Sequence, residues 1–114
     1  MCGGALGKLE AIGRALYRRP PTSSELRIWG MTVEEWEEEQ EPVEVWPEHE
    51  QAYRLFVGLR TQWRVGFSGP TGLDYGVLYR DLDRLNLTPE QYEELRQEIR
   101  VMESAALDEM HRED

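Results

Sequence analysis

The chain has 114 residues, 23 acidic and 13 basic side chains and a net charge of −10, a size that suits one folded domain with its own core. Its single cysteine excludes an internal disulfide and a cysteine-based zinc site, and it fits a reducing cytoplasm. The acidic balance argues against nucleic acid as a partner, because phosphate neutralisation dominates that kind of binding. No apolar run reaches about 18 residues, so we expect no transmembrane helix and no membrane partner.

An amphipathic helix is predicted over residues 5–18, where apolar side chains recur at helical spacing. Glycines such as Gly7 and Gly13 lower its intrinsic stability, so we expect this helix to fray or to fold only against a partner. Pro20 and Pro21 end it, because proline cannot continue a helix.

Two short helices are predicted next, behind capping boxes at residues 22–25 and 32–35. The second begins a Glu-rich stretch, which is either a solvated face or a docking site for a basic surface. Trp36, flanked by glutamates, is a candidate exposed anchor for a protein partner; the alternative is that it packs back onto the domain. We assign residues 1–40 to an amphipathic and acidic N-terminal extension that is partly flexible, and residues 41–114 to a helical core domain.

A central core helix is predicted from Pro47 to about Arg64. A further helix is expected with Thr71 as its N-cap and Asp74 at its third position. The clearest helix start is TPEQ at residues 88–91, which opens a long C-terminal helix. The predicted fold class is therefore all-α: a small helical domain of three to five helices with a long C-terminal helix and a Gly/Pro-rich corner.

The corner is the stretch TQWRVGFSGPTGLDYG at residues 61–76, in which glycines allow unusual backbone angles and proline blocks a helix. We expect a rigid helix–corner–helix element in which Trp63 packs inside and Gly72 permits close approach. Arg64 is expected to pair with Asp74 or with a backbone carbonyl. The residues assigned to this structural corner are Trp63, Gly69, Pro70, Gly72 and Asp74.

No residue set has the spacing of a catalytic, cofactor or metal site, so we expect a protein that is not an enzyme and uses no cofactor. The corner lacks the Lys-Ser/Thr of a phosphate-binding loop. His49 has no second histidine four residues on, and we expect it to be exposed in a first helical turn. Cys2 lies in a Gly-rich start where nothing would hold a base in place. The candidate protein-interaction residues are Trp36, Trp46, Arg64 and Tyr75.

Four motifs occur in order along the chain: VEVWPE, TQWRVG, GPTGLDY and IRVMESAAL. With them, residues 41–111 resemble a family of small phage proteins from the tail-gene neighbourhood of long-tailed phages and prophages, described as phage-related proteins of unknown function. The resemblance implies a tail assembly chaperone that acts in the host cell cytoplasm and transiently binds the tape-measure protein, the major tail (tube) protein or both. Self-association is left open. The recurring positions of the family map here onto Trp46, Pro47, Gln62, Trp63, Arg64, Gly69, Gly72, Leu73, Asp74 and Tyr75.

Two other functions compete with this one. A structural tail or neck component of the virion would have the same gene neighbourhood. An acidic host-directed inhibitor would use the Glu-rich segment to mimic the charge of nucleic acid, through Glu34, Glu35, Glu37, Glu38 and Glu39. An enzyme ranks last, because the sequence offers no catalytic set.

Overall fold

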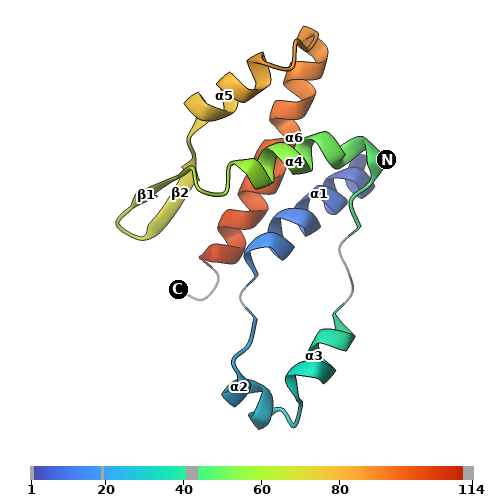
Figure 1. Ribbon diagram of the computed structural model, residues 1–114, viewed down its shortest axis with the longest axis vertical. Helices are drawn as coiled ribbons and strands as arrows, with labels where there is room; N and C mark the ends of the chain where they lie inside the picture. The colour runs from blue at the N-terminus through green and yellow to red at the C-terminus, as the bar shows by residue number, and fades with distance from the viewer. Residues whose placement is uncertain (1, 19, 41–43, 112–114) are drawn as a thin grey trace.

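The computed structural model describes residues 2–18, 20–40 and 44–111. Within these ranges the chain forms six α-helices, one 3-10 turn and a two-stranded antiparallel sheet (Figure 1). In chain order they are α1 (Cys2–Tyr17), α2 (Ser23–Ile28), α3 (Val33–Glu39), the 3-10 turn η1 (Pro47–His49), α4 (Glu50–Gly58), β1 (Trp63–Gly66), β2 (Gly69–Leu73), α5 (Tyr75–Asp83) and α6 (Pro89–Met110). None of the described helices is long and apolar enough to cross a membrane.

Three helix starts follow the local rules read from the sequence. Thr22, Thr32 and Thr88 each form the predicted capping box. In each box the threonine hydroxyl accepts the backbone N–H three residues on, and the Glu or Gln side chain there accepts the threonine N–H. Pro89 occupies the first turn of α6, where a missing N–H breaks no helical hydrogen bond. The predicted long C-terminal helix is confirmed as α6.

The fold is mostly helical, as predicted, but it is not all-α. The predicted central helix ends at Gly58 in α4 rather than near Arg64, and the predicted corner is a β-hairpin of β1 and β2. Apolar residues at helical spacing continue to Trp63 and mimic a longer helix. Glycine is a weak helix former, and the C-cap Leu59 has a φ of −94° and a ψ of 6°, which differ from helical angles, so the helix ends at this point.

The hairpin turns through the two-residue loop between Gly66 and Gly69. Gly69 has a φ of 105°, in the region that favours glycine. The register shift leaves one extra residue in β2, Thr71, and a bulge of this kind is one of the few places where a strand accepts a proline such as Pro70. The Cα partners are Trp63 with Leu73, Arg64 with Gly72, Val65 with Pro70, and Gly66 with Gly69.

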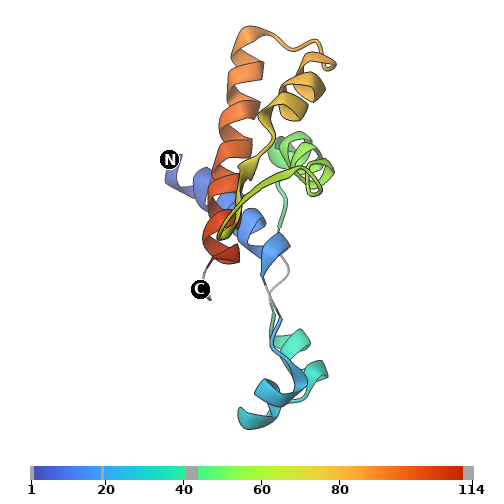
Figure 2. The same ribbon diagram turned by 90° about the vertical axis from the view of Figure 1, so that its left-hand side faces the viewer.

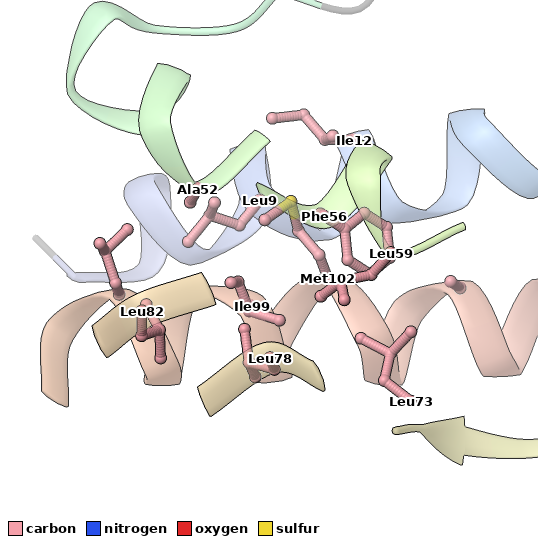
Figure 3. Close-up of a cluster of buried hydrophobic side chains, with 12 residues drawn as sticks. Leu9, Ile12, Ala52, Phe56, Leu59, Leu73, Leu78, Leu82, Ile99 and Met102 are labelled. Atoms are coloured by element: carbon pink, nitrogen blue, oxygen red, sulfur yellow. The ribbon is translucent and has the colours of Figure 1, made fainter. Parts of the chain in front are cut away.

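The core forms where α1, α4 and α5 meet α6, and Figure 3 shows their apolar side chains in one cluster. α1 packs along α6 with Gly13 against the backbone. A Cβ on Gly13 would overlap the carbonyl oxygen of Met102, so only glycine allows the two helices to come this close. The helix expected to be weak by itself is thus held by α6. The buried cluster comprises Leu9, Ile12, Ala52, Phe56, Leu59, Leu73, Leu78, Leu82, Leu95, Ile99, Met102 and Ala106.

α2 and α3 form a helical arm, residues 22–40, that projects from the body (Figures 1 and 2). The two short helices pack mainly on each other. Leu26 is buried in the arm but does not belong to the main cluster, whereas Leu9 and Ile12 of α1 do. Of the stretch assigned to the N-terminal extension, α1 therefore shares the core with α4, α5 and α6, and the arm stands apart from it.

Candidate protein-interaction surfaces

The hairpin is anchored on α6 by one carboxylate. Oε2 of Glu103 accepts the N–H of Leu73 at 2.8 Å, and its Oε1 accepts the hydroxyl of Tyr75 at 2.6 Å. A Cβ on Gly72 would lie 3.3 Å from the same Oε2, so the β2 backbone at this glycine lies close to a side chain of α6. Burial, the hydrogen bond to Glu103 and the charge of Glu103 raise the pKa of Tyr75. The Tyr75 hydroxyl, a candidate for partner contact, is therefore engaged inside the chain.

Two further contacts hold the hairpin, one at its base and one next to its loop. Nε1 of Trp63 donates to the hydroxyl of Tyr17 at 2.8 Å, and its ring packs edge-on against Tyr17 and Phe56. Trp63 is thus partly buried and packs against the edge of the core. On the other strand, the carbonyl oxygen of Pro70 accepts a hydrogen bond from Nε2 of His111, 2.8 Å away. The base of the hairpin is therefore fixed to α1 and α4, and β2 is fixed next to the loop to His111, which follows α6.

Asp74 and Arg64 do not form the predicted pair. Oδ1 of Asp74 accepts the N–H groups of Gly76 and Val77 at 3.0 and 3.4 Å, so Asp74, and not Thr71, is the N-cap of α5. The predicted N-cap at Thr71 is wrong because β2 continues through Leu73, so α5 begins three residues later than expected. The Arg64 side chain is exposed and makes no ion pair within the described residues, while its own carbonyl oxygen accepts the Thr71 hydroxyl at 3.3 Å.

The tip of the hairpin presents two apolar side chains to solvent. Val65 is 72% exposed and Phe67 is fully exposed. Both lie outside the core cluster, and sequence reasoning missed them because it took residues 61–76 for a corner. The signal was present: Trp63, Val65 and Phe67 alternate with other residues, and glycines flank a two-residue loop, which is the pattern of a hairpin.

Trp46 covers the start of α4. Its ring stacks on His49 at 5.7 Å between centroids with an angle of 9° between planes, and Nζ of Lys8 lies 5.6 Å from the ring centroid on Trp46. Nε1 of Trp46 donates to Oε1 of Glu44 at 3.3 Å. His49 is only 2% exposed, so the expectation of an exposed histidine is wrong; its Nδ1 has no hydrogen-bond partner in the described part of the chain. Trp46 therefore joins α1 to η1, and it is half-buried.

The sequence indicates Trp36 as a candidate exposed anchor of the arm, but the structure exposes other apolar residues more. Trp36 is half-buried on α3, whereas Ile28 is 81% exposed, Trp29 is 58% exposed and Val33 is 42% exposed. These three lie at the turn between α2 and α3, at the end of the arm away from the body (Figures 1 and 2). The glutamates of α3 are also exposed. The arm thus ends in an apolar patch that the glutamates of α3 border on one side, while Arg27 of α2 lies next to Ile28.

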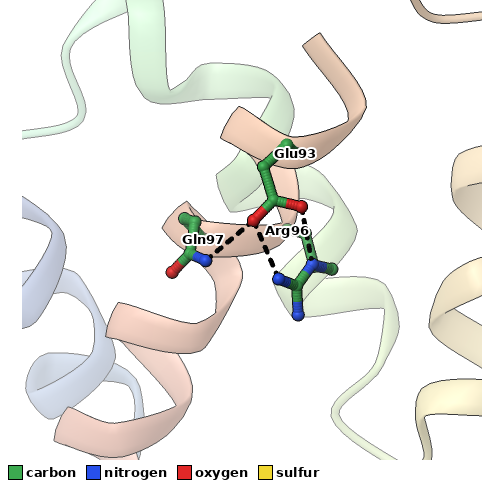
Figure 4. Close-up of polar contacts among 3 residues, drawn as sticks. All are labelled: Glu93, Arg96 and Gln97. Carbon is green, nitrogen blue, oxygen red and sulfur yellow. Dashed lines mark hydrogen bonds and ion pairs between the residues drawn. The ribbon is translucent and has the colours of Figure 1, made fainter. Parts of the chain in front are cut away.

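A polar network lies near the start of α6 (Figure 4). The two carboxylate oxygens of Glu93 accept from Nε and Nη2 of Arg96 at 3.1 and 2.8 Å, and Nε2 of Gln97 donates to Glu93 at 2.9 Å. These bonds lower the pKa of Glu93 to about 2. Since the bidentate pair lies one helical turn apart, it supports α6 locally and engages Arg96 within the chain.

A pocket of about 190 Å³ opens beside α6, and it is lined in part by Glu48, Glu94 and Glu98. Burial, followed by the charges of Glu94 and Glu48, raises the pKa of Glu98 from its ordinary value of 4.5 to about 7. No group of three or more His, Cys, Asp or Glu side chains among the described residues is placed to hold a metal ion.

Replacing Glu98 with glutamine should stabilise the protein at neutral pH and leave it nearly unchanged in acid. Because the folded-state pKa is raised, the stability contribution of Glu98 is fully present below pH 4.5 and is lost as pH rises to about 7. Urea denaturation across this window should therefore show wild type falling relative to Glu98→Gln. Glu94→Gln, which removes one of the neighbouring charges, should shrink the difference. Parallel pH profiles for wild type and Glu98→Gln would contradict the pKa shift.

One family comparison covers the chain from the turn between α2 and α3 to the end of α6, and so includes α3, α4, the hairpin, α5 and α6. The model of the family described as "Phage related hypothetical protein (DUF1799)" matches residues 29–110, which is more than half of the chain. No curated protein and no solved structure matches. The family match confirms the phage-related family that the sequence motifs resemble, and the matched residues include Trp29 at the arm tip and Phe67 at the hairpin tip.

Proposed function

The chain belongs to this phage-related family, and from that premise we propose that it is a phage tail assembly chaperone. The proposed protein is not an enzyme, acts in the host cell cytoplasm, and transiently binds the tape-measure protein, the major tail (tube) protein or both during tail assembly. The observation that carries the proposal is the exposed apolar tip of the hairpin, Val65 and Phe67, which lies within the matched residues.

An assembly chaperone must cover apolar surface that its partner exposes before assembly. Exposed apolar side chains are a common sign of such contact, and an aromatic ring buries a large area at a low cost in conformational entropy. Phe67, the first residue of the two-residue loop, offers this kind of ring. An apolar segment of a tail protein is the partner that fits it.

The anchoring of the hairpin supports the same role. Glu103 and Trp63 fix the two strands to the helical body through hydrogen bonds of 2.8 Å, so the tip is presented without further ordering of the backbone. A surface that is already ordered loses less entropy when it binds. The net charge of −10 also favours the role. Two complexes that each carry this acidic chain repel one another, which opposes premature association of the bound tail proteins.

Replacing Phe67 with serine should reduce capture of the tail protein at least about tenfold, because an aromatic anchor at the centre of a contact carries much of its binding energy. The measurement is a pull-down of the tagged full chain, co-expressed with the tape-measure and tail-tube proteins of its own gene cluster. Leu85→Ser is the matched control: it removes another apolar side chain, 37% exposed, near the end of α5. That variant should capture as much as wild type.

Each other outcome points elsewhere. If wild type captures neither tail protein, the chaperone proposal fails. If mass spectrometry finds the chain in many copies in purified mature particles, it is a structural tail or neck component. If Phe67→Ser and Leu85→Ser capture equally well, the hairpin tip is not the binding surface.

A further inference from the structure

We infer that the chain forms a reciprocal dimer, in which the arm tip of each copy docks into a groove at the base of the arm of the other. The arm tip is the patch of Ile28, Trp29 and Val33 with Glu34 beside it. The base groove is lined by Leu16, Tyr17, Val57 and Arg60. The occupant is thus a second copy of the chain, and the inference stands apart from the proposed tail-protein contact at the hairpin.

The arm tip is an apolar surface that the chain itself leaves uncovered. Ile28 ends α2, Trp29 caps it, and Val33 begins α3, so the three residues flank one turn. An exposed tryptophan beside an exposed isoleucine is unfavourable in water and typical of a contact surface. Because α2 and α3 pack mainly on each other, the described part of the body leaves the patch exposed.

The base groove is the complementary surface. It has a volume of about 150 Å³ and lies between the C-terminal ends of α1 and α4. Leu16, on one side of it, is 41% exposed although it belongs to the apolar face of α1. The groove can therefore accept apolar side chains, and the Arg60 on its wall adds a positive charge.

Charge complementarity selects a second copy as the occupant. Glu34 at the arm tip and Arg60 at the groove are both exposed, and neither forms an ion pair inside the described part of the chain. Arg18, also exposed, follows α1 at the same end of the body. An apolar patch with an acidic border on one part of the chain thus matches an apolar groove with a basic border on another.

The geometry favours docking of the arm tip into the groove of a second copy over docking into the groove of its own chain. The groove is lined by Leu16 and Tyr17 at the end of α1, after which the arm begins. The turn between α2 and α3 lies at the far end of the arm (Figures 1 and 2). A tip therefore cannot reach its own groove while the arm stays extended. Two antiparallel arms related by a two-fold axis place each tip at the other base, which closes the assembly at two copies and forms the same contact twice.

The test is sedimentation velocity of the full-length protein over a concentration series. Wild type should show a monomer–dimer equilibrium, and Trp29→Ser should weaken dimerisation at least about tenfold. Arg60→Glu and Glu34→Lys should each weaken it as well, and the double variant should regain most of the loss because the charges are exchanged. Arg100→Glu, which makes the same charge change at an exposed site on α6, is the matched control and should dimerise like wild type.

Circular dichroism and thermal unfolding establish that each variant is folded, which is expected because all the substituted residues are exposed. A wild type that stays monomeric at every concentration overturns the inference. So does a dimer whose dissociation constant is unchanged by Trp29→Ser, since another surface must then form it. Open-ended assembly would contradict the reciprocal, closed contact. Phe67→Ser should still dimerise, so failure of the dimer and failure of the tail-protein proposal are read from different variants.

Discussion

Gly13→Ala is expected to lower the free energy of unfolding by about 1–3 kcal/mol, although alanine is the better helix former. The reason is the packing of α1: a Cβ at this position would overlap the carbonyl oxygen of Met102 and lie 3.1 Å from its carbonyl carbon. A backbone cannot rotate away as a side chain can, so α1 must shift and loosen the contacts of Leu9 and Ile12. Urea denaturation followed by circular dichroism measures the change.

Gly7 provides the matched control within the same helix. It is exposed, and a Cβ there would meet nothing within 4 Å. Gly7→Ala should therefore raise stability by up to about 1 kcal/mol through helix propensity alone. Opposite signs for the two variants would establish that α1 packs on α6 in solution. Stabilisation by both would mean that α1 is not held against α6.

Glu103→Ala is expected to cost about 2–4 kcal/mol, because one side chain accepts two hydrogen bonds in a partly buried place. Without it, the N–H of Leu73 and the hydroxyl of Tyr75 lose their acceptor, and the hairpin loses its tie to α6. Tyr75→Phe removes only one of the two bonds and should cost about 1 kcal/mol. Equal losses for the two variants would contradict the shared-acceptor geometry. Both losses are measured by urea denaturation.

The same contact gives an alkaline signature. The pKa of Tyr75 is raised above its ordinary value of 10.0, first by burial and then by the hydrogen bond and charge of Glu103. A raised folded-state pKa contributes stability that is present below pH 10.0 and is lost as pH rises beyond it. Wild type should therefore lose stability in strong alkali more steeply than Tyr75→Phe.

Much of the helical framework could be predicted from the sequence, while the candidate surfaces could not. The three capping boxes and the long α6 follow from residues within one or two turns. Trp36 was selected for its glutamate neighbours, yet the structure exposes Trp29 more. Solvent exposure depends on how the two short helices pack, and the spacing of residues along α3 does not contain that information.

The hairpin shows where local reading fails. Its strands have four and five residues, too short for a strong alternating pattern, and the apolar spacing before them imitates a helix. The hairpin depends on distant partners: Leu73 bonds to a carboxylate 30 positions away, and Trp63 bonds to a hydroxyl 46 positions away. Such long-range contacts outweigh the local helical tendency of this segment, and they cannot be read from the neighbouring residues.

By itself, the sequence determined the three helix starts at Thr22, Thr32 and Thr88, the mostly helical class and the phage-related family, because caps, periodicity and motifs are properties of neighbouring residues. Only the tertiary structure decided that α1 is held through Gly13, that His49 is buried under Trp46, and that Phe67 points into solvent. Each of these depends on the distance between elements that lie far apart in the chain. Burial and exposure are set by that packing, which no local pattern specifies.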